Sequence, residues 1–88
     1  MKHYKTMLRE FLPLYVEAIR ENRNFSQEEM SEQLHITPRA YNNLKQGRFC
    51  FSIVPLVFLL LMLDGEEMKV FLDGLRGKVD ALELIYES

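Results

Sequence analysis

The chain has 88 residues, the size of one compact domain, and leaves little room for a second. With 48% hydrophobic and 27% charged residues, the composition excludes a disordered chain and indicates a soluble globular protein. The net charge of −2 provides only a weak electrostatic field, and the single cysteine excludes an intrachain disulfide.

The first predicted element is an amphipathic helix. No apolar stretch with a cleavage site precedes it, so we expect no signal peptide and a cytoplasmic location. Pro13 lies inside the apolar pattern and either kinks the helix or marks its start, so the firm helical part is residues 12–21. The pattern has the spacing of a helix and comprises Met7, Leu8, Phe11, Leu12, Tyr15, Val16 and Ile19.

A second, short helix begins after Ser26. The side chain of Ser26 can accept a hydrogen bond from the backbone N–H of Glu29, and Glu29 can reach back to the backbone of Ser26, which makes a capping box. Glu28 and Glu29 also lie favourably at the positive end of the helix dipole. Met30 and Leu34 supply one apolar stripe, so the helix runs to about Leu34.

A third helix is predicted over residues 38–46. Thr37 can cap it, and Pro38 suits the first helical position because its missing N–H would have no partner there. Gly47 supplies a left-handed stop. Because only residues 35–37 separate this helix from the second, the two cannot lie antiparallel and must cross steeply.

The fourth predicted helix, residues 53–63, is almost wholly apolar. Ser52 can cap it, and residues 64–65 end it. A bilayer-spanning helix needs about 20 apolar residues. This segment is much shorter, so we expect a buried core helix and no membrane role.

Two further helices are predicted, over residues 66–75 and 79–87, with Gly77 between them. Taken together, the elements predict an all-α fold. It is a compact bundle of five to six helices in a single domain that spans residues 1–88.

Residues 26–47 resemble the helix-turn-helix of the lambda-repressor/Cro-type (XRE-like) family of DNA-binding proteins. The resemblance covers about residues 5–75, and the closing helix lies outside it. It implies a lambda-repressor-like fold and a sequence-specific transcriptional regulator, a repressor that inserts residues 38–46 into the major groove of double-stranded DNA. The family pattern asks for apolar side chains at five positions, all apolar here: Met30, Leu34, Ile36, Tyr41 and Leu44.

The resemblance places four side chains against the bases. Arg39 can form two hydrogen bonds with guanine O6 and N7, and Asn43 can do the same with adenine N6 and N7. Gln27, at the start of its helix, can contact a phosphate or a base with its amide and its side chain. Pro38 can offer only apolar contact, for example to a thymine methyl group.

Phosphate contacts are expected from the more basic half of the chain. Residues 1–50 hold eight basic and six acidic side chains (+2), whereas residues 51–88 hold three and seven (−4). Family members often carry several basic residues after the recognition helix, but here only Arg48 follows it, which implies weaker binding. The expected phosphate contacts are Arg20, Ser26, Lys45, Gln46 and Arg48.

The sequence departs from the family at two further places. The turn has His35 where the family usually has Gly, so His35 is expected to be left-handed at some cost. Many members pair an Arg of the first helix with a Glu late in the recognition helix, but here those positions are Arg20 and Lys45. Either Glu17 or Glu21 takes a basic partner, or both cations are available for phosphates.

Nothing in the sequence indicates catalysis or a cofactor. It contains no phosphate loop, nucleophile elbow or metal motif, so we expect neither an enzyme nor a cofactor-binding protein. His3 and His35 lie in separate elements without a ligand motif nearby, and no metal site is expected. Cys50 is expected to be a buried thiol.

The apolar content exceeds what one small core needs. We therefore expect a homodimer formed through the fourth, fifth or last helix, with recognition helices about 34 Å apart along the DNA. The alternative, favoured by the acidic charge, is a protein-interaction module with a protein partner, such as an antitoxin or adaptor that keeps the fold with weak or no DNA binding. The excess consists of Phe49, Phe51, residues 53–63, Leu82, Ile85 and Tyr86.

Overall fold

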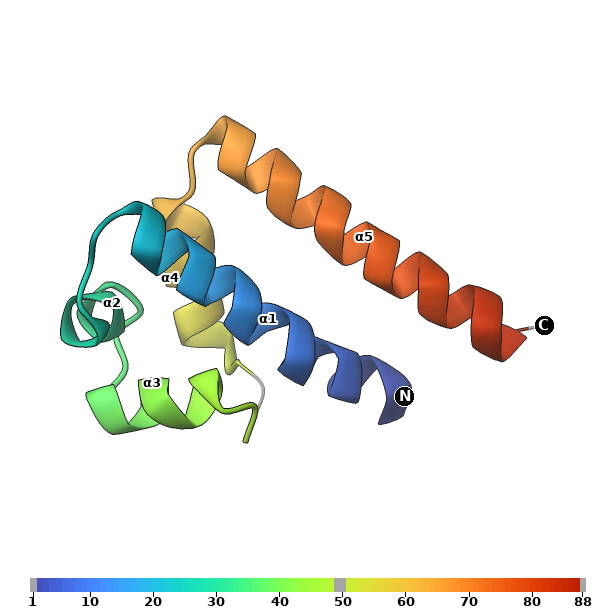
Figure 1. Ribbon diagram of the computed structural model, residues 1–88, viewed down its shortest axis with the longest axis horizontal. Helices are drawn as coiled ribbons and strands as arrows, with labels where there is room; N and C mark the ends of the chain where they lie inside the picture. The colour runs from blue at the N-terminus through green and yellow to red at the C-terminus, as the bar shows by residue number, and fades with distance from the viewer. Residues whose placement is uncertain (1, 49–50, 88) are drawn as a thin grey trace.

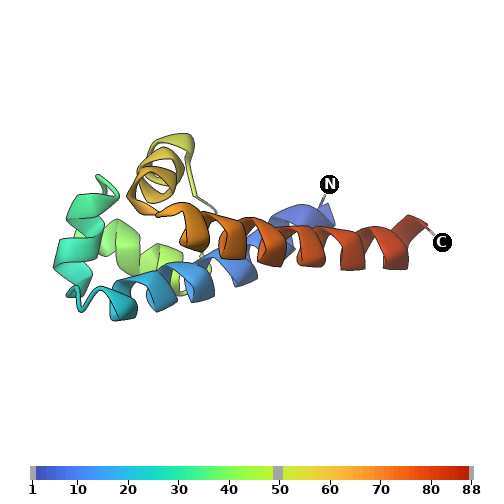
Figure 2. The same ribbon diagram turned by 90° about the horizontal axis from the view of Figure 1, so that it is seen from above.

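The computed structural model describes residues 2–48 and 51–87, and within these ranges it contains five helices and no strand (Figure 1). Two long helices, α1 and α5, run side by side in opposite directions, and the shorter helices gather where α1 ends and α5 begins (Figures 1 and 2). The predicted all-α bundle is therefore confirmed. The helices are α1 (Lys2–Asn22), α2 (Gln27–Gln33), α3 (Pro38–Lys45), α4 (Ile53–Met62) and α5 (Gly65–Glu87).

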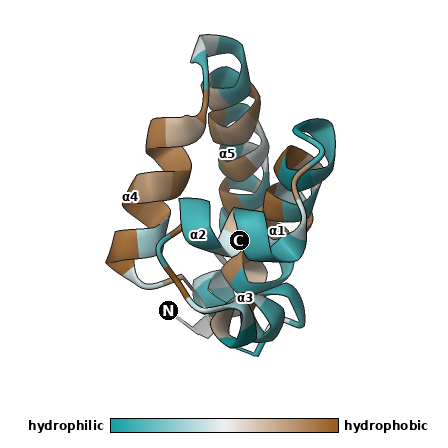
Figure 3. Ribbon diagram, turned by 90° about the vertical axis from the view of Figure 1, so that its left-hand side faces the viewer, coloured by the Kyte–Doolittle hydropathy of each residue, from teal (hydrophilic) through white to brown (hydrophobic). Residues whose placement is uncertain are grey.

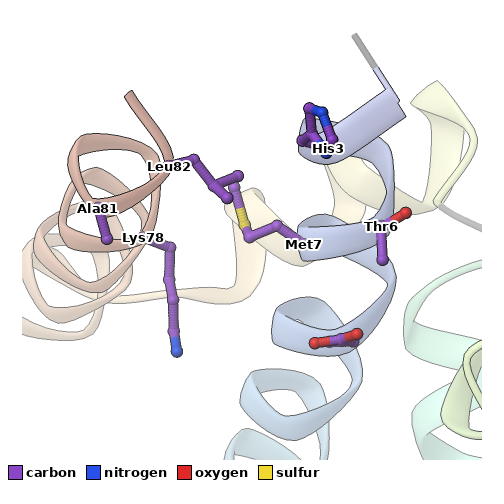
Figure 4. Close-up of a pocket in the computed structure, with 7 residues that line it drawn as sticks. His3, Thr6, Met7, Lys78, Ala81 and Leu82 are labelled. Atoms are coloured by element: carbon purple, nitrogen blue, oxygen red, sulfur yellow. The ribbon is translucent and has the colours of Figure 1, made fainter. Parts of the chain in front are cut away.

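α1 starts well before the predicted residues and runs through Pro13. Its first half is held by packing against α5, since Met7 is buried and points toward Leu82 (Figure 4). Pro13 has no N–H to bond the carbonyl of Arg9. A Cβ atom at Gly47 would lie 3.5 Å from that carbonyl oxygen, so the backbone just after the third helix, α3, lies close to it. Tertiary packing of an amphipathic face thus outweighs the local cost of the proline.

α5 is one continuous helix, which corrects the prediction of two helices over residues 66–75 and 79–87. Gly77 lies inside it, and nothing is within 4 Å of the place where its Cβ would be. A glycine inside a helix costs only about 1 kcal/mol relative to alanine. Both halves of α5 face α1, through Phe71 and Leu82, and this burial holds the helix together across Gly77.

Residues 64–65, predicted to end the fourth helix, in fact start α5. An Asp64 carboxylate oxygen accepts a hydrogen bond from the backbone N–H of Glu67 (2.8 Å), and the Glu67 carboxylate accepts one from the backbone N–H of Asp64 (3.0 Å). This is a capping box. Two α1 side chains bind the same residue: Tyr15 donates to the Glu67 carbonyl (2.9 Å) and Arg23 to its carboxylate (2.7 Å). The start of α5 is therefore fixed to α1.

Two apolar groups hold the fold together. Between α1 and α5, the Tyr15 and Phe71 rings lie 4.7 Å apart, and the Phe11 ring lies 3.4 Å from where a Cβ of Gly74 would be. The other group is the core behind α3, where the four N-terminal helices meet. Its buried members are Val16, Ile19, Met30, Leu34, Tyr41 and Leu59.

α4 buries only one side. Pro55 and Leu59 face the core, as a core helix should, but Ile53 and Leu61 are 75% and 73% exposed, together with Val54 and Val57. Figure 3 shows α4 as a mostly hydrophobic ribbon at the edge of the molecule. The expected burial on all sides is therefore not achieved within one copy of the chain.

The ends of α4 differ in part from the prediction. Ser52 occupies the N-cap position with extended backbone, but its side chain makes no capping hydrogen bond. The predictions for Phe49 and Cys50 lie outside the described residues. None of the helices in the described ranges combines the length and the apolar character needed to cross a membrane.

Candidate nucleic-acid interface

Both predicted helix starts of the central motif are confirmed. The Ser26 hydroxyl accepts a hydrogen bond from the backbone N–H of Glu29 (3.0 Å), and the Glu29 carboxylate accepts one from the backbone N–H of Ser26 (2.8 Å). The Thr37 hydroxyl accepts from the backbone N–H of Ala40 (3.0 Å), and Pro38 is at the first helical position. These caps satisfy N–H groups that have no partner inside the helix.

A residue with left-handed backbone conformation follows each of α1, α2 and α3. His35, between α2 and α3, has φ 59°, as predicted from the glycine usually found there. Its ring stacks on Phe58 of α4 at a centroid distance of 3.8 Å, a contact that glycine cannot make. Gly47 ends α3 with φ 72°, also as predicted. Asn24, between α1 and α2, has φ 56° and was not identified from the sequence.

The core braces α3 from behind in the way the family pattern implies. Tyr41 and Leu44 are buried beneath it, Met30 and Leu34 of α2 are fully buried, and Ile36 is half-buried against the same core. With α2 and α3 fixed in this way, the opposite face of α3 is turned away from the protein.

The outward face of α3 is polar. Arg39 and Pro38 are exposed at its start, Gln46 is exposed just beyond its end, and Asn43 is half-buried between them. Asn42 is also exposed on this face, although sequence reasoning did not select it. The available signal was its helical spacing, since a residue three positions after Arg39 lies on the same side of a helix.

Two of the predicted contact residues touch each other. Arg48 donates a hydrogen bond from Nη1 to the side-chain oxygen of Asn43 at 3.0 Å. An amide oxygen can accept two hydrogen bonds, so this bond occupies one of its two acceptor positions. The guanidinium of Arg48 is therefore folded back beside the outward face of α3.

Glu17 of α1 decides between the alternatives that the sequence left open for Arg20 and Lys45. Arg20 donates to both oxygens of the Glu17 carboxylate, at 3.0 and 3.1 Å, and Lys45 Nζ lies 3.9 Å from it. The Tyr41 hydroxyl also donates to this carboxylate. Arg20 binds the Phe25 carbonyl as well, at 2.8 Å, so its guanidinium is engaged within the protein.

The pKa values of Glu17 and Tyr41 reflect these hydrogen bonds and the burial of both groups. Burial by itself would raise the pKa of Glu17, but the hydrogen bonds from Arg20 and Tyr41 outweigh it and hold the pKa below its ordinary value. Burial, followed by the hydrogen bond to Glu17, raises the pKa of Tyr41. The carboxylate therefore stays charged and the hydroxyl neutral near pH 7.

The remaining predicted contacts lie at the start of α2. Ser26 is exposed, and Gln27 is half-buried in the first turn. Glu28, Glu29 and Glu32 are exposed on the same short helix. From Ser26 to Arg48 the chain carries three basic and three acidic side chains, so the motif is neutral overall.

In the part of the chain that the structure describes, no three His, Cys, Asp or Glu side chains gather as they would around a metal ion.

The comparisons with known proteins agree with this geometry. The model of a helix-turn-helix domain family matches residues 16–68, which is more than half of the chain and includes α2, the turn, α3 and α4. No curated protein and no solved structure matches the chain. Proteins of this DNA-binding family are typically not enzymes. The chain thus belongs to the helix-turn-helix domain family, in its lambda-repressor/Cro (XRE-like) group, and is a DNA-binding helix-turn-helix regulator.

Proposed function

We propose that the protein is a sequence-specific transcriptional repressor that inserts α3 into the major groove of double-stranded DNA. The observation that carries this proposal is the position of Arg39. It is exposed on the face of α3 opposite Tyr41 and Leu44, which anchor the helix in the core. A short helix braced in this way presents its first turns to base edges.

The base contacts follow from chemistry and position. Arg39 binds guanine O6 and N7, and Asn43 binds adenine through its amide. Pro38 packs on a thymine methyl group, and Gln27 sets the register from the start of α2. We add Asn42 to this group, because it is exposed beside Arg39.

Phosphate contacts come from the margins of the motif. Lys45, Gln46, Arg48 and Ser26 are all exposed and carry donors suited to phosphate oxygens. Arg20 is assigned a structural role instead, because its guanidinium is bonded to Glu17 and to the Phe25 carbonyl.

The repressor acts as a homodimer on a short palindrome. Support comes from the exposed aliphatic side of α4 and from further exposed apolar residues on α5, among them Val70 and Leu72. Apolar surface of this kind on a small protein commonly marks an interface. Twofold symmetry brings two α3 helices to half-sites about 34 Å apart, and repression follows from occupying the promoter.

Selection of bound duplexes from a random pool tests the proposal and defines the operator. On the selected duplex, Arg39→Ala is expected to weaken binding by about 1–3 kcal/mol and to relax the preference at one base pair. Lys69→Ala is the matched control, since Lys69 is 79% exposed on α5, away from the motif. Enrichment of no sequence, or equal affinities of the two variants, contradicts the proposal.

A second function is favoured by two observations. The uncharged, exposed side of α4 together with the net charge of −2 suits a protein-interaction module, such as an antitoxin or adaptor, that keeps the fold without relying on DNA. Binding to random duplex at increasing salt separates the two functions. A DNA-binding protein loses affinity as salt rises, whereas an interaction module shows no binding to lose.

A further inference from the structure

α5 carries apolar residues on a partly exposed side over its middle, residues 72–79. It extends well past α4, as Figure 2 shows, and Leu82 on its inner side points toward Met7 of α1 (Figure 4). On the neighbouring side, Leu72 is 51% exposed, and Leu75 and Val79 are half-buried. These three residues are spaced by three and four positions, which is the spacing of a seam that packs against another helix.

Charged residues flank this seam, the basic one first and the acidic ones after it along the helix. The apolar and charged residues together line a shallow groove of about 430 Å³: Leu72, Leu75, Arg76, Val79, Asp80 and Glu83. Arg76 is the basic member, and the two acidic members follow it along the helix. At a helical rise of about 1.5 Å per residue, Asp80 lies about 6 Å and Glu83 about 10 Å beyond Arg76. Among the described residues, Arg76 has no ion-pair partner.

We propose that this seam binds the same seam of a second copy of the chain, with the two α5 helices antiparallel. The inference rests on the homodimer of the proposed function and specifies its interface. A twofold axis near Val79 places Arg76 of each copy against Asp80 and Glu83 of the other copy. The apolar seam residues then lie between the two sets of charges. A parallel pair in register would instead place Arg76 against Arg76 of the other copy and the acidic residues against each other. Contacts between like charges are unfavourable. The charge order therefore selects the antiparallel pair.

Engineered disulfides test the orientation. In a Cys50→Ser background, Val79→Cys is expected to form a covalent dimer under mild oxidation. A residue beside the twofold axis lies close to the same residue of the other copy. Leu72→Cys is the matched control. It lies seven residues from Val79, so its two copies are about 21 Å apart in an antiparallel pair. A disulfide needs Cα atoms closer than about 7 Å. Crosslinking of Val79→Cys alone supports the proposal, and crosslinking of both variants or of neither overturns it.

Charge reversal tests the contact without cysteine chemistry. Sedimentation of the full chain in the absence of DNA is expected to show dimers that Arg76→Glu and Asp80→Arg each weaken by at least about tenfold. The double variant, in which the charges are exchanged, is expected to recover most of the wild-type association. Equal dimerisation of all four proteins, or a wild-type chain that stays monomeric, overturns the proposal.

The two proposals fail separately in these experiments. If the wild-type chain binds its selected duplex but α5 does not pair, the antiparallel interface is wrong and the repressor function stands. If α5 pairs and no duplex is selected, the repressor function is wrong and the interface stands. Circular dichroism of Arg76→Glu and Asp80→Arg checks that both remain helical, as expected for exposed positions.

Discussion

The hydroxyl of Tyr41 donates a hydrogen bond to the carboxylate of Glu17 and thereby joins α3 directly to α1. The same carboxylate binds Arg20 on α1 and lies near Lys45 on α3. Where many family members use an Arg of the first helix and a Glu of the third, this chain places the acid on α1 and the donors around it. One carboxylate therefore helps to set the position of α3.

Replacement of Glu17 by Gln is expected to lower the free energy of unfolding by about 1.5–3 kcal/mol, because a charged acceptor of several hydrogen bonds is lost. Urea denaturation measures the change. Glu21→Gln is the matched control, since Glu21 is exposed on the same helix. Equal midpoints for the two variants contradict a role of Glu17 in anchoring α3.

The lowered pKa of Glu17 predicts a loss of stability in acid. The unfolded carboxyl titrates near 4.5 and the folded one lower, so its contribution is present above pH 4.5 and is lost as the pH falls through the folded pKa. Unfolding free energies between pH 7 and pH 3 measure this. Glu17→Gln is expected to show a shallower decline, and parallel curves for the two proteins speak against the assignment.

The N-cap positions of α3 and α4, Thr37 and Ser52, predict different effects of substitution by alanine. Thr37→Ala is expected to cost about 1 kcal/mol, because the Thr37 hydroxyl accepts a hydrogen bond from the backbone of α3. Ser52→Ala is expected to change stability by less than about 0.5 kcal/mol, because the Ser52 side chain makes no capping bond. Thermal unfolding of both variants checks the contrast, and similar losses would count against the α4 start described above.

Two glycines predict changes of opposite sign. Gly77→Ala is expected to stabilise the protein by about 0.5–1 kcal/mol, because the site is helical and open. Gly47→Ala is expected to destabilise it by about 1 kcal/mol, because its φ of 72° is left-handed. Chemical denaturation gives both values. Destabilisation by Gly77→Ala would indicate that α5 is broken at this residue.

The neutral motif predicts a shallow salt dependence of DNA binding. With Lys45 and Arg48 as the cations that contact phosphate, the logarithm of the association constant should fall with the logarithm of the salt concentration with a slope of about −2 per protomer. Removing the charges of Glu28 and Glu32 with Gln should tighten binding by about threefold at low salt. Gel shifts at several salt concentrations measure both, and a slope near zero contradicts phosphate contact.

Local signals predicted the central motif well. The capping box at Ser26, the cap at Thr37 and the left-handed conformations of His35 and Gly47 each depend on residues a few positions apart. The apolar brace behind α3 was equally readable, because it follows the helical period.

Long-range packing explains what the sequence did not reveal. Pro13 and Gly77 disfavour helix locally, yet contacts between α1 and α5 carry both helices through them. The choice of Glu17 rather than Glu21 as the acid for Arg20 and Lys45 also depends on where α3 packs. Such facts are fixed by tertiary structure and not by neighbouring residues.

α1 is one continuous helix that holds α3 through Glu17 and the start of α5 through Tyr15 and Arg23. α1 thus connects the proposed DNA-contacting helix and the proposed dimer-forming helix through one continuous element. Each added base pair between half-sites would turn one of them by about 34–36° about the DNA axis. Because one continuous helix connects the two elements, the protein is expected to select the spacing of its half-sites as strictly as the bases within them.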